Sequence, residues 1–137
     1  MAQTQEATNL GYGELGKLVA GEGAGALKSV LGLTDACTAS ESSTFAKPGG
    51  ATKLAANGFK LVDADSVKSV KGTVDNDTVQ LDEIFTATGT QSVSGFAVEN
   101  EEDDVVYAEC CFNAAVACET DDTLTVQMKM RFKKGSA

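Results

Sequence analysis

Residues 123–133, TLTVQMKMRFK, establish the fold class, because polar and apolar residues alternate along this stretch without a break. The expected apolar face consists of Leu124, Val126, Met128, Met130 and Phe132, and the expected polar face of Thr125, Gln127, Lys129, Arg131 and Lys133. A period of two predicts a β-strand, because a helix would scatter the five apolar side chains around its circumference. One covered face is typical of a strand in an antiparallel sheet. Burial of each such side chain contributes roughly 1.5–3 kcal/mol relative to exposure.

Several similar segments precede this one. A Val-rich segment at 66–74 ends at the turn Asp75-Asn76-Asp77, and the other expected strands lie at 26–33, 78–88, 91–99 and 105–116. Acidic or Gly-containing turns at 89–90, 100–104 and 119–122 separate them. Short strands at intervals of about ten residues predict an all-β protein, an antiparallel β-sandwich or jelly-roll-like fold.

The N-terminal region differs in composition from the rest of the chain. Six glycines fall within the first 25 residues, and they limit the expected helix there to a short one at 14–20. We therefore expect residues 1–25 to form a Gly-rich N-terminal arm that is flexible or serves in assembly, and residues 26–137 to form a single β-sandwich domain.

Composition excludes several function classes. The chain has 137 residues and a formal net charge of −9, which argues against nucleic acid as a partner because phosphate binding requires a basic face. It has no histidine, the commonest general base and metal ligand. No apolar run approaches the ~18–20 residues of a membrane span, and the N-terminus lacks the pattern of a secretory signal. We expect a soluble domain with no enzymatic activity and no membrane partner.

Charge is distributed unevenly along the chain. Residues 1–71 are neutral, residues 72–128 contain thirteen acids and no cation, and residues 129–137 contain four cations. The basic end is expected to pair with acidic neighbours or to dock on another subunit. The alternative is a solvated surface that serves solubility alone.

The four cysteines, Cys37, Cys110, Cys111 and Cys118, leave three interpretations open. Buried free thiols are favoured, disulfides formed after release from the cell come second, and a metal site comes last because paired Cys-x₂₋₄-Cys spacings are missing. Cys110 and Cys111 are expected on opposite faces of one strand. Neighbouring acids raise thiol pKa values, so we expect no catalytic cysteine.

Two further motifs have some features of binding sites. The acidic turn at 99–104 could hold Ca²⁺ through clustered carboxylates, but it lacks the ligand spacing of an EF-hand, and a solvated hairpin is favoured. The GEGAG stretch at 21–25 lacks the spacing of a dinucleotide-binding loop and is interpreted as a linker. The sequence therefore predicts no catalytic, cofactor-binding or metal-ligating residues and no cofactor.

Three segments carry a resemblance to a known group of proteins. They are VLGLTDACTASESST (30–44), DEIFTATGTQSVSGFAVEN (82–100) and YAECCFNAAVACETDDTLTVQMKMRF (107–132). Through them the chain resembles small virion structural proteins of tailed bacterial and archaeal viruses, of the decoration or tail-associated type. The resemblance implies a non-enzymatic β-sandwich, made in the host cytoplasm, that works by assembling into a virus particle.

The expected function is that of a capsid decoration or stabilising protein. Its expected partners are copies of itself, as a homo-oligomer, and other virion proteins such as the major capsid protein. A tail- or fibre-associated structural protein is the alternative. A carbohydrate- or receptor-binding module is disfavoured because the chain has no tryptophan and two tyrosines, which provides few aromatic platforms. A filament subunit that assembles by strand donation is a further alternative.

Overall fold

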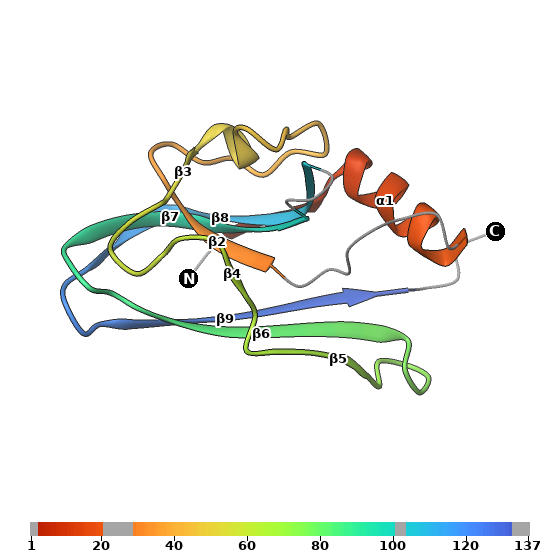
Figure 1. The fold of residues 1–137 in the computed structure, drawn as a ribbon. Coiled ribbons are helices and arrows are strands. Elements are labelled where there is room, and N and C mark those ends of the chain that lie inside the picture. The colour runs from red at the N-terminus through yellow and green to blue at the C-terminus, as the bar shows by residue number, and fades with distance from the viewer. Residues whose placement is uncertain (1–2, 21–28, 101–103, 133–137) are drawn as a thin grey trace.

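The computed structural model describes residues 3–20, 29–100 and 104–132, which form β-strands, one α-helix and one 3₁₀ turn (Figure 1). In chain order the elements are β1 (Gln3–Ala7), α1 (Asn9–Ala20), β2 (Ser29–Thr34), η1 (Pro48–Gly50), β3 (Thr52–Lys53), β4 (Val62–Asp63), β5 (Ser66–Val70), β6 (Thr78–Thr86), β7 (Gln91–Asn100), β8 (Val105–Cys118) and β9 (Thr123–Arg131).

The strands form two antiparallel sheets. Sheet A has the order β1-β8-β7-β2-β3, and β4 also pairs with β2. Sheet B has the order β5-β6-β9. Figure 1 shows sheet B as a second layer beneath sheet A, with α1 at one end. The predicted all-β antiparallel sandwich is confirmed.

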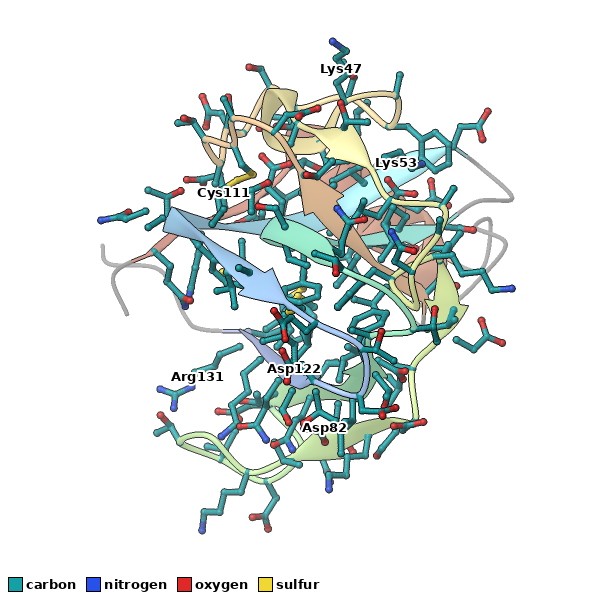
Figure 2. All side chains as sticks on the ribbon, turned by 90° about the vertical axis from the view of Figure 1, so that its left-hand side faces the viewer. Lys47, Lys53, Asp82, Cys111, Asp122 and Arg131 are labelled. Carbon is teal, nitrogen blue, oxygen red and sulfur yellow. A yellow bond between two sulfur atoms is a disulfide. The ribbon has the colours of Figure 1, made fainter. Side chains whose placement is uncertain are left out.

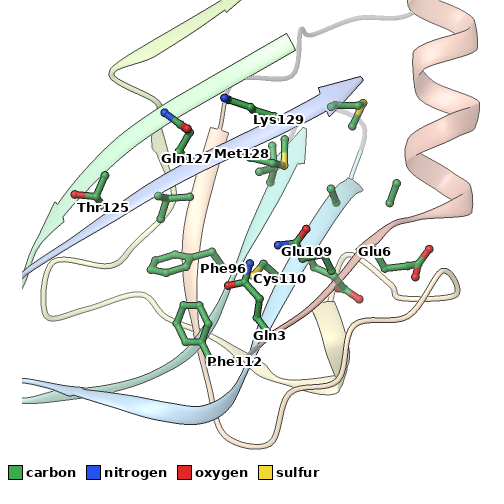
Figure 3. Close-up of a pocket in the computed structure, with 16 residues that line it drawn as sticks. Gln3, Glu6, Phe96, Glu109, Cys110, Phe112, Thr125, Gln127, Met128 and Lys129 are labelled. Carbon is green, nitrogen blue, oxygen red and sulfur yellow. The ribbon is translucent and has the colours of Figure 1, made fainter. Parts of the chain in front are cut away.

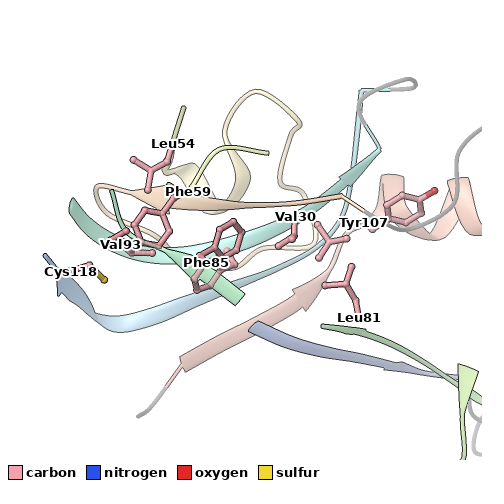
Figure 4. Close-up of a cluster of buried hydrophobic side chains, with 11 residues drawn as sticks. Val30, Leu54, Phe59, Leu81, Phe85, Val93, Tyr107 and Cys118 are labelled. Carbon is pink, nitrogen blue, oxygen red and sulfur yellow. The ribbon is translucent and has the colours of Figure 1, made fainter. Parts of the chain in front are cut away.

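The main core lies between the sheets and is built around phenylalanine (Figure 4). Phe59 and Phe85 have ring centroids 5.7 Å apart, and Phe85 stacks on Phe96 at 5.3 Å. Phe96 then meets the edge of Phe112 at 5.6 Å. Aromatic pairs at these separations contribute about 0.5–1.5 kcal/mol beyond their buried area. The row of rings extends from the closed centre of the sandwich toward its β8 side.

Sheet A is covered on its other face as well. The connection between β2 and β3 folds back over the sheet, and a second apolar cluster forms there from Leu31, Leu33, Ala51 and Ala97. Val30, by contrast, belongs to the core between the sheets. β2 is therefore buried on both faces, which is why it reads as a continuous apolar run.

Residues 3–20, which belong to the expected arm, contain β1 and α1. β1 pairs with β8 from Gln3 opposite Phe112 to Ala7 opposite Ala108, and α1 packs against β8. A Cβ at Gly11 would lie 2.5 Å from the carbonyl oxygen of Tyr107, so this glycine permits close packing of the helix on the sheet. Contact with β8 offsets the low helix propensity of the glycines. The helix therefore spans Asn9–Ala20 and is longer than the expected 14–20. Residues 1–2 and 21–25 of the expected arm lie outside the described residues.

The final strand forms where it was predicted, but its burial is incomplete. Leu124, Val126, Met128 and Met130 face sheet A and are half-buried, while the outward side chains of β9 are exposed. Phe132 follows the end of β9 and is 54% exposed, so its expected place on the buried face is wrong. The reason is position: β9 is the edge of sheet B and pairs with β6 alone among the described strands.

Candidate functional site

A groove of about 330 Å³ lies between the sheets, where β9 faces β8 and β1 (Figure 3). The inner faces of four strands line it. Its lining includes Gln3 and Gln5 of β1, Phe96 and Val98 of β7, Ala108, Cys110 and Phe112 of β8, and Val126, Met128 and Met130 of β9.

The alternation of the strands makes this groove apolar. Phe96 and Val98 are buried at its base, and Cys110 lies directly opposite Phe96 in the β7–β8 pairing. Met128 and Met130 form the sheet B wall and are half-buried. Among the polar residues of the lining, Gln3 and Gln5 of β1 pair with the groove residues Phe112 and Cys110. The other polar lining residues are Glu6 of β1, Glu109 of β8, and Thr125, Gln127 and Lys129 of β9. Apolar side chains from β7, β8 and β9 therefore form a large part of the groove surface.

The groove opens between two sheet edges. β1 ends sheet A and β9 ends sheet B, so each has one side without a strand partner among the described residues. Backbone N–H and C=O groups on such an edge can pair with another strand. The groove therefore combines an apolar interior with free hydrogen-bonding edges.

Cys110 is the one thiol in the groove, and Figure 3 shows it beside Phe96. Burial raises its pKa above the ordinary thiol range, which keeps the sulfur protonated and a weak nucleophile. Cys118 is also free and buried in the core, and burial together with nearby Asp122 raises its pKa. The raised pKa keeps each thiol in its neutral form at pH 7.

Cys37 and Cys111 form a disulfide on the outer face of sheet A, so the favoured expectation of free thiols is wrong for this pair (Figure 2). The loop after β2 returns over the sheet and brings Cys37 to β8, although 74 residues separate the two. Gly49, at a φ of 60°, packs so closely that a Cβ there would lie 2.7 Å from the Cys111 sulfur. Cys110 and Cys111 do face opposite sides of β8, as predicted.

Buried Glu109 anchors the same loop. Its Oε1 accepts a hydrogen bond of 2.7 Å from the backbone N–H of Ser40 and another from the hydroxyl of Ser43. The Ser43 hydroxyl oxygen in turn accepts the N–H of Gly49 at 3.1 Å. The Ser/Thr-rich stretch is thus a fixed cover on sheet A, held by one disulfide and one carboxylate.

A partly buried ion pair lies where β2, β3 and β7 meet. Lys53 Nζ is 2.7 Å from Glu99 Oε2, and the Glu99 side chain is fully buried. The same ammonium group lies 3.6 Å from the centre of the Phe45 ring. The cation is therefore shared between a carboxylate and an aromatic face, which makes the arrangement structural.

The outer face of sheet B is polar. Asp82 accepts hydrogen bonds from the side-chain amides of Gln80 at 2.8 Å and Gln127 at 2.9 Å. These bonds, with a smaller contribution from Lys68 and Lys129, hold the pKa of Asp82 below its usual range. This face stays charged at neutral pH, and Ile84 is an exposed apolar side chain on it.

Glu83 is the one carboxylate on the inner face of β6. Burial raises its pKa above the ordinary value, although the backbone N–H of Asp65 donates to it at 2.8 Å. Asp65 precedes β5, just after the chain crosses from sheet A to sheet B, and its own carboxylate accepts the N–H of Ile84 at 3.3 Å. The two acids fasten this crossing to β6.

The structure adds no support for a binding site at the acidic turn 99–104 or at the GEGAG stretch 21–25. Of the acidic turn, Glu99, Asn100 and Asp104 are described, and Glu99 pairs with Lys53. The described residues contain no group of three or more cysteines and acids placed to hold a metal ion. The GEGAG stretch lies outside them. Within the same residues, no helix has both the length and the apolar character needed to cross a bilayer.

Only one wall of the groove could be predicted from the sequence. The alternation of residues 123–133 identified its β9 wall, but the contribution of β1 had none, because Gln3–Ala7 is short and polar. Comparison of the chain with protein-family models, with curated proteins and with solved structures found no match.

Proposed function

We propose that this protein is a non-enzymatic structural subunit of a virus particle, a capsid decoration protein that acts through contacts with copies of itself and with other virion proteins. The assignment to a virus particle rests on the resemblance of three segments, at 30–44, 82–100 and 107–132, to virion structural proteins. Its mode of action is supported by one structural observation: the apolar groove lies between two free strand edges. A surface of that kind suits another polypeptide strand better than a small polar substrate.

The half-buried row on β9 supports an assembly role. Val126, Met128 and Met130 face the groove without being fully covered by the rest of the described chain. Apolar side chains in contact with water at a strand edge gain free energy when a partner covers them. In a protein that functions as a monomer, this strand edge would be covered or would carry charged side chains on its inner face.

The disulfide supports a place of action outside the reducing cytoplasm. Disulfides persist in extracellular particles and surfaces, whereas cytosolic thiols are kept reduced. The Cys37–Cys111 bond joins the loop over sheet A to β8. A protein that is assembled in a cell and then works on a released particle would gain this bond after release.

The test of the proposal is the mass of the purified chain in solution. Light scattering coupled to size exclusion should give an oligomer at micromolar concentration, and dilution should shift it toward the monomer. A monomer throughout the range up to about a millimolar would contradict self-assembly. In the parent virus, deletion of the gene should remove density from the capsid surface in electron micrographs, while loss of density from the tail would contradict the capsid location.

A further inference from the structure

We infer that β9 pairs antiparallel with β9 of a second copy of this chain, about a two-fold axis at Gln127. This inference rests on the proposed function, because it names the edge through which the subunit contacts a copy of itself. The pairing would join the two copies of sheet B into one six-stranded sheet and bring their grooves together.

Among the edge strands of the two sheets, β9 is the one that we expect to pair with a second copy. It has nine residues, contains neither proline nor glycine, and pairs with β6 without a register shift. At the other edge of sheet B, β5 has five residues and an exposed lysine, Lys68, at its centre. In sheet A, β1 is short and polar, and β3 and β4 have two residues each. Short edges offer few backbone groups to an added strand, so β9, the longest of these edges, is the one best suited to strand addition.

The register follows from the residue pattern. Gln127 is the midpoint of Thr123–Arg131, so pairing centred there includes every residue of the strand. It sets Val126 opposite the partner's Met128, and Leu124 opposite the partner's Met130, with apolar facing apolar. A displacement by one residue would oppose polar to apolar side chains. Centring the pairing on Lys129 would place two lysines directly opposite each other, which is unfavourable.

Charge favours the same register. Arg131 would lie opposite the partner's Thr123 and thus next to the partner's Asp122. Asp121 and Asp122 are exposed in the turn that precedes β9, and β9 itself contains two cations and no acid. By symmetry the contact occurs twice, once at each end of the paired strands. Local attraction between the basic end and the acidic turn opposes the general repulsion of two chains with a net charge of −9.

Apolar burial provides the driving force. Val126, Met128 and Met130 of each copy are half-buried and line a groove bordered by β9, an edge strand of sheet B. In the paired arrangement the partner's β9 would cover that edge, and the half-buried row would become interior. The outward face would remain polar and solvated, with Gln127 next to the partner's Gln127.

A cysteine at the axis tests the register directly. In a Cys110→Ser background, we expect Gln127→Cys to form a symmetric intermolecular disulfide under mild oxidation, seen as a covalent dimer without reductant. Residues paired across antiparallel strands have Cα atoms about 4.5–5.5 Å apart, within the ~4.4–6.8 Å range of disulfides. Gln127 points outward, so the substitution leaves the core intact.

Two further variants serve as matched controls on the same face of β9. Thr125→Cys and Lys129→Cys should each fail to cross-link alone, because identical positions would lie four residues apart, about 13 Å along the strands. An equal mixture of the two should cross-link, because residue 125 of one copy faces residue 129 of the other. The mixture also tests the register if Gln127→Cys fails to fold.

The outcomes separate this inference from the proposed function. An oligomer by light scattering in which neither Gln127→Cys nor the mixture cross-links would overturn the β9 pairing and leave self-assembly standing. Equal cross-linking of all three single variants would also overturn the register. A chain that stays monomeric would overturn both proposals.

Charge reversal tests the contact between Arg131 and the acidic turn. Arg131→Glu should raise the dimer dissociation constant roughly tenfold, whereas Lys68→Glu on β5 should leave it unchanged. An unaltered dissociation constant in Arg131→Glu would contradict the contact with the acidic turn.

Discussion

Leu81 on β6 and Met128 on β9 lie directly opposite each other in sheet B, yet Leu81 is completely buried whereas Met128 is only half-buried. The inner face of sheet B is therefore fully buried at Leu81 on β6 and only partly buried at Met128 on the neighbouring strand β9. β6 lies within the sheet and faces the phenylalanine core, while β9 forms the wall of the groove. The same apolar pattern thus serves stability on one strand and remains available for contact on the next.

Alanine substitutions should measure that difference in burial. Leu81→Ala is expected to lower the free energy of unfolding by about 2–5 kcal/mol, because it leaves a cavity in a closed core. Met128→Ala should lower it by less, because solvent already reaches that side chain. Urea unfolding of the monomeric fraction measures both values, and equal losses would mean that the groove is closed.

Loss of the Cys37–Cys111 disulfide should reduce stability without unfolding the protein. The bond closes a long stretch of chain, and its removal in a Cys37→Ala/Cys111→Ala variant is expected to lower the free energy of unfolding by about 2–4 kcal/mol. Reductant should destabilise the wild type by a similar amount and leave the double variant unchanged. An effect of reductant on both proteins would assign the loss to another cause.

Two glycines of α1 should respond in opposite ways to alanine. Gly11→Ala is expected to destabilise the fold, because its Cβ would lie 2.5–2.9 Å from the backbone of Tyr107. Gly13→Ala should stabilise it by roughly 0.5–1 kcal/mol, because no atom lies within 4 Å of the added carbon and alanine favours the helix. Thermal unfolding compares the pair. A stabilising Gly11→Ala would show that α1 does not pack closely on β8.

The Asp77 carboxylate should make stability depend on pH in the acid range. It accepts the backbone N–H groups of Val74, Thr73 and Gly72, which lower its pKa well below the ordinary value of 3.8. Because the folded state favours the charged form, this contribution is complete above pH 3.8 and is lost as the pH falls toward the folded pKa.

We therefore expect Asp77→Asn to destabilise the protein at pH 7 and to lose much of that effect below about pH 3. Asp75→Asn is the control in the same turn, because Asp75 is exposed and its only ion pair in the described structure is a 3.8 Å contact with Lys71. Unfolding curves at several pH values give the comparison. A pH-independent loss in Asp77→Asn would contradict the role of its charge.

The strands from β5 onward could be placed from sequence because their signals are local. Alternation and acidic turns located β6, β7, β8 and β9 to within a few residues. The opposite facing of Cys110 and Cys111 followed from the same period of two. β1 could not be recognised, because Gln3–Ala7 has no apolar face and becomes a strand only by pairing with β8. The helix was underestimated for a similar reason, since contact with Tyr107 compensates for its glycines.

The sequence by itself determined the all-β class, the strand that forms the groove wall and the separation of charge between body and final segment, because each depends on neighbours within a few residues. Only the tertiary structure decided that Cys37 reaches Cys111, that β1 completes sheet A and that β9 is left at an open edge. These features join residues 70 to 100 or more positions apart or depend on what fails to cover a strand. No local periodicity encodes such information, because it arises only when the two sheets pack.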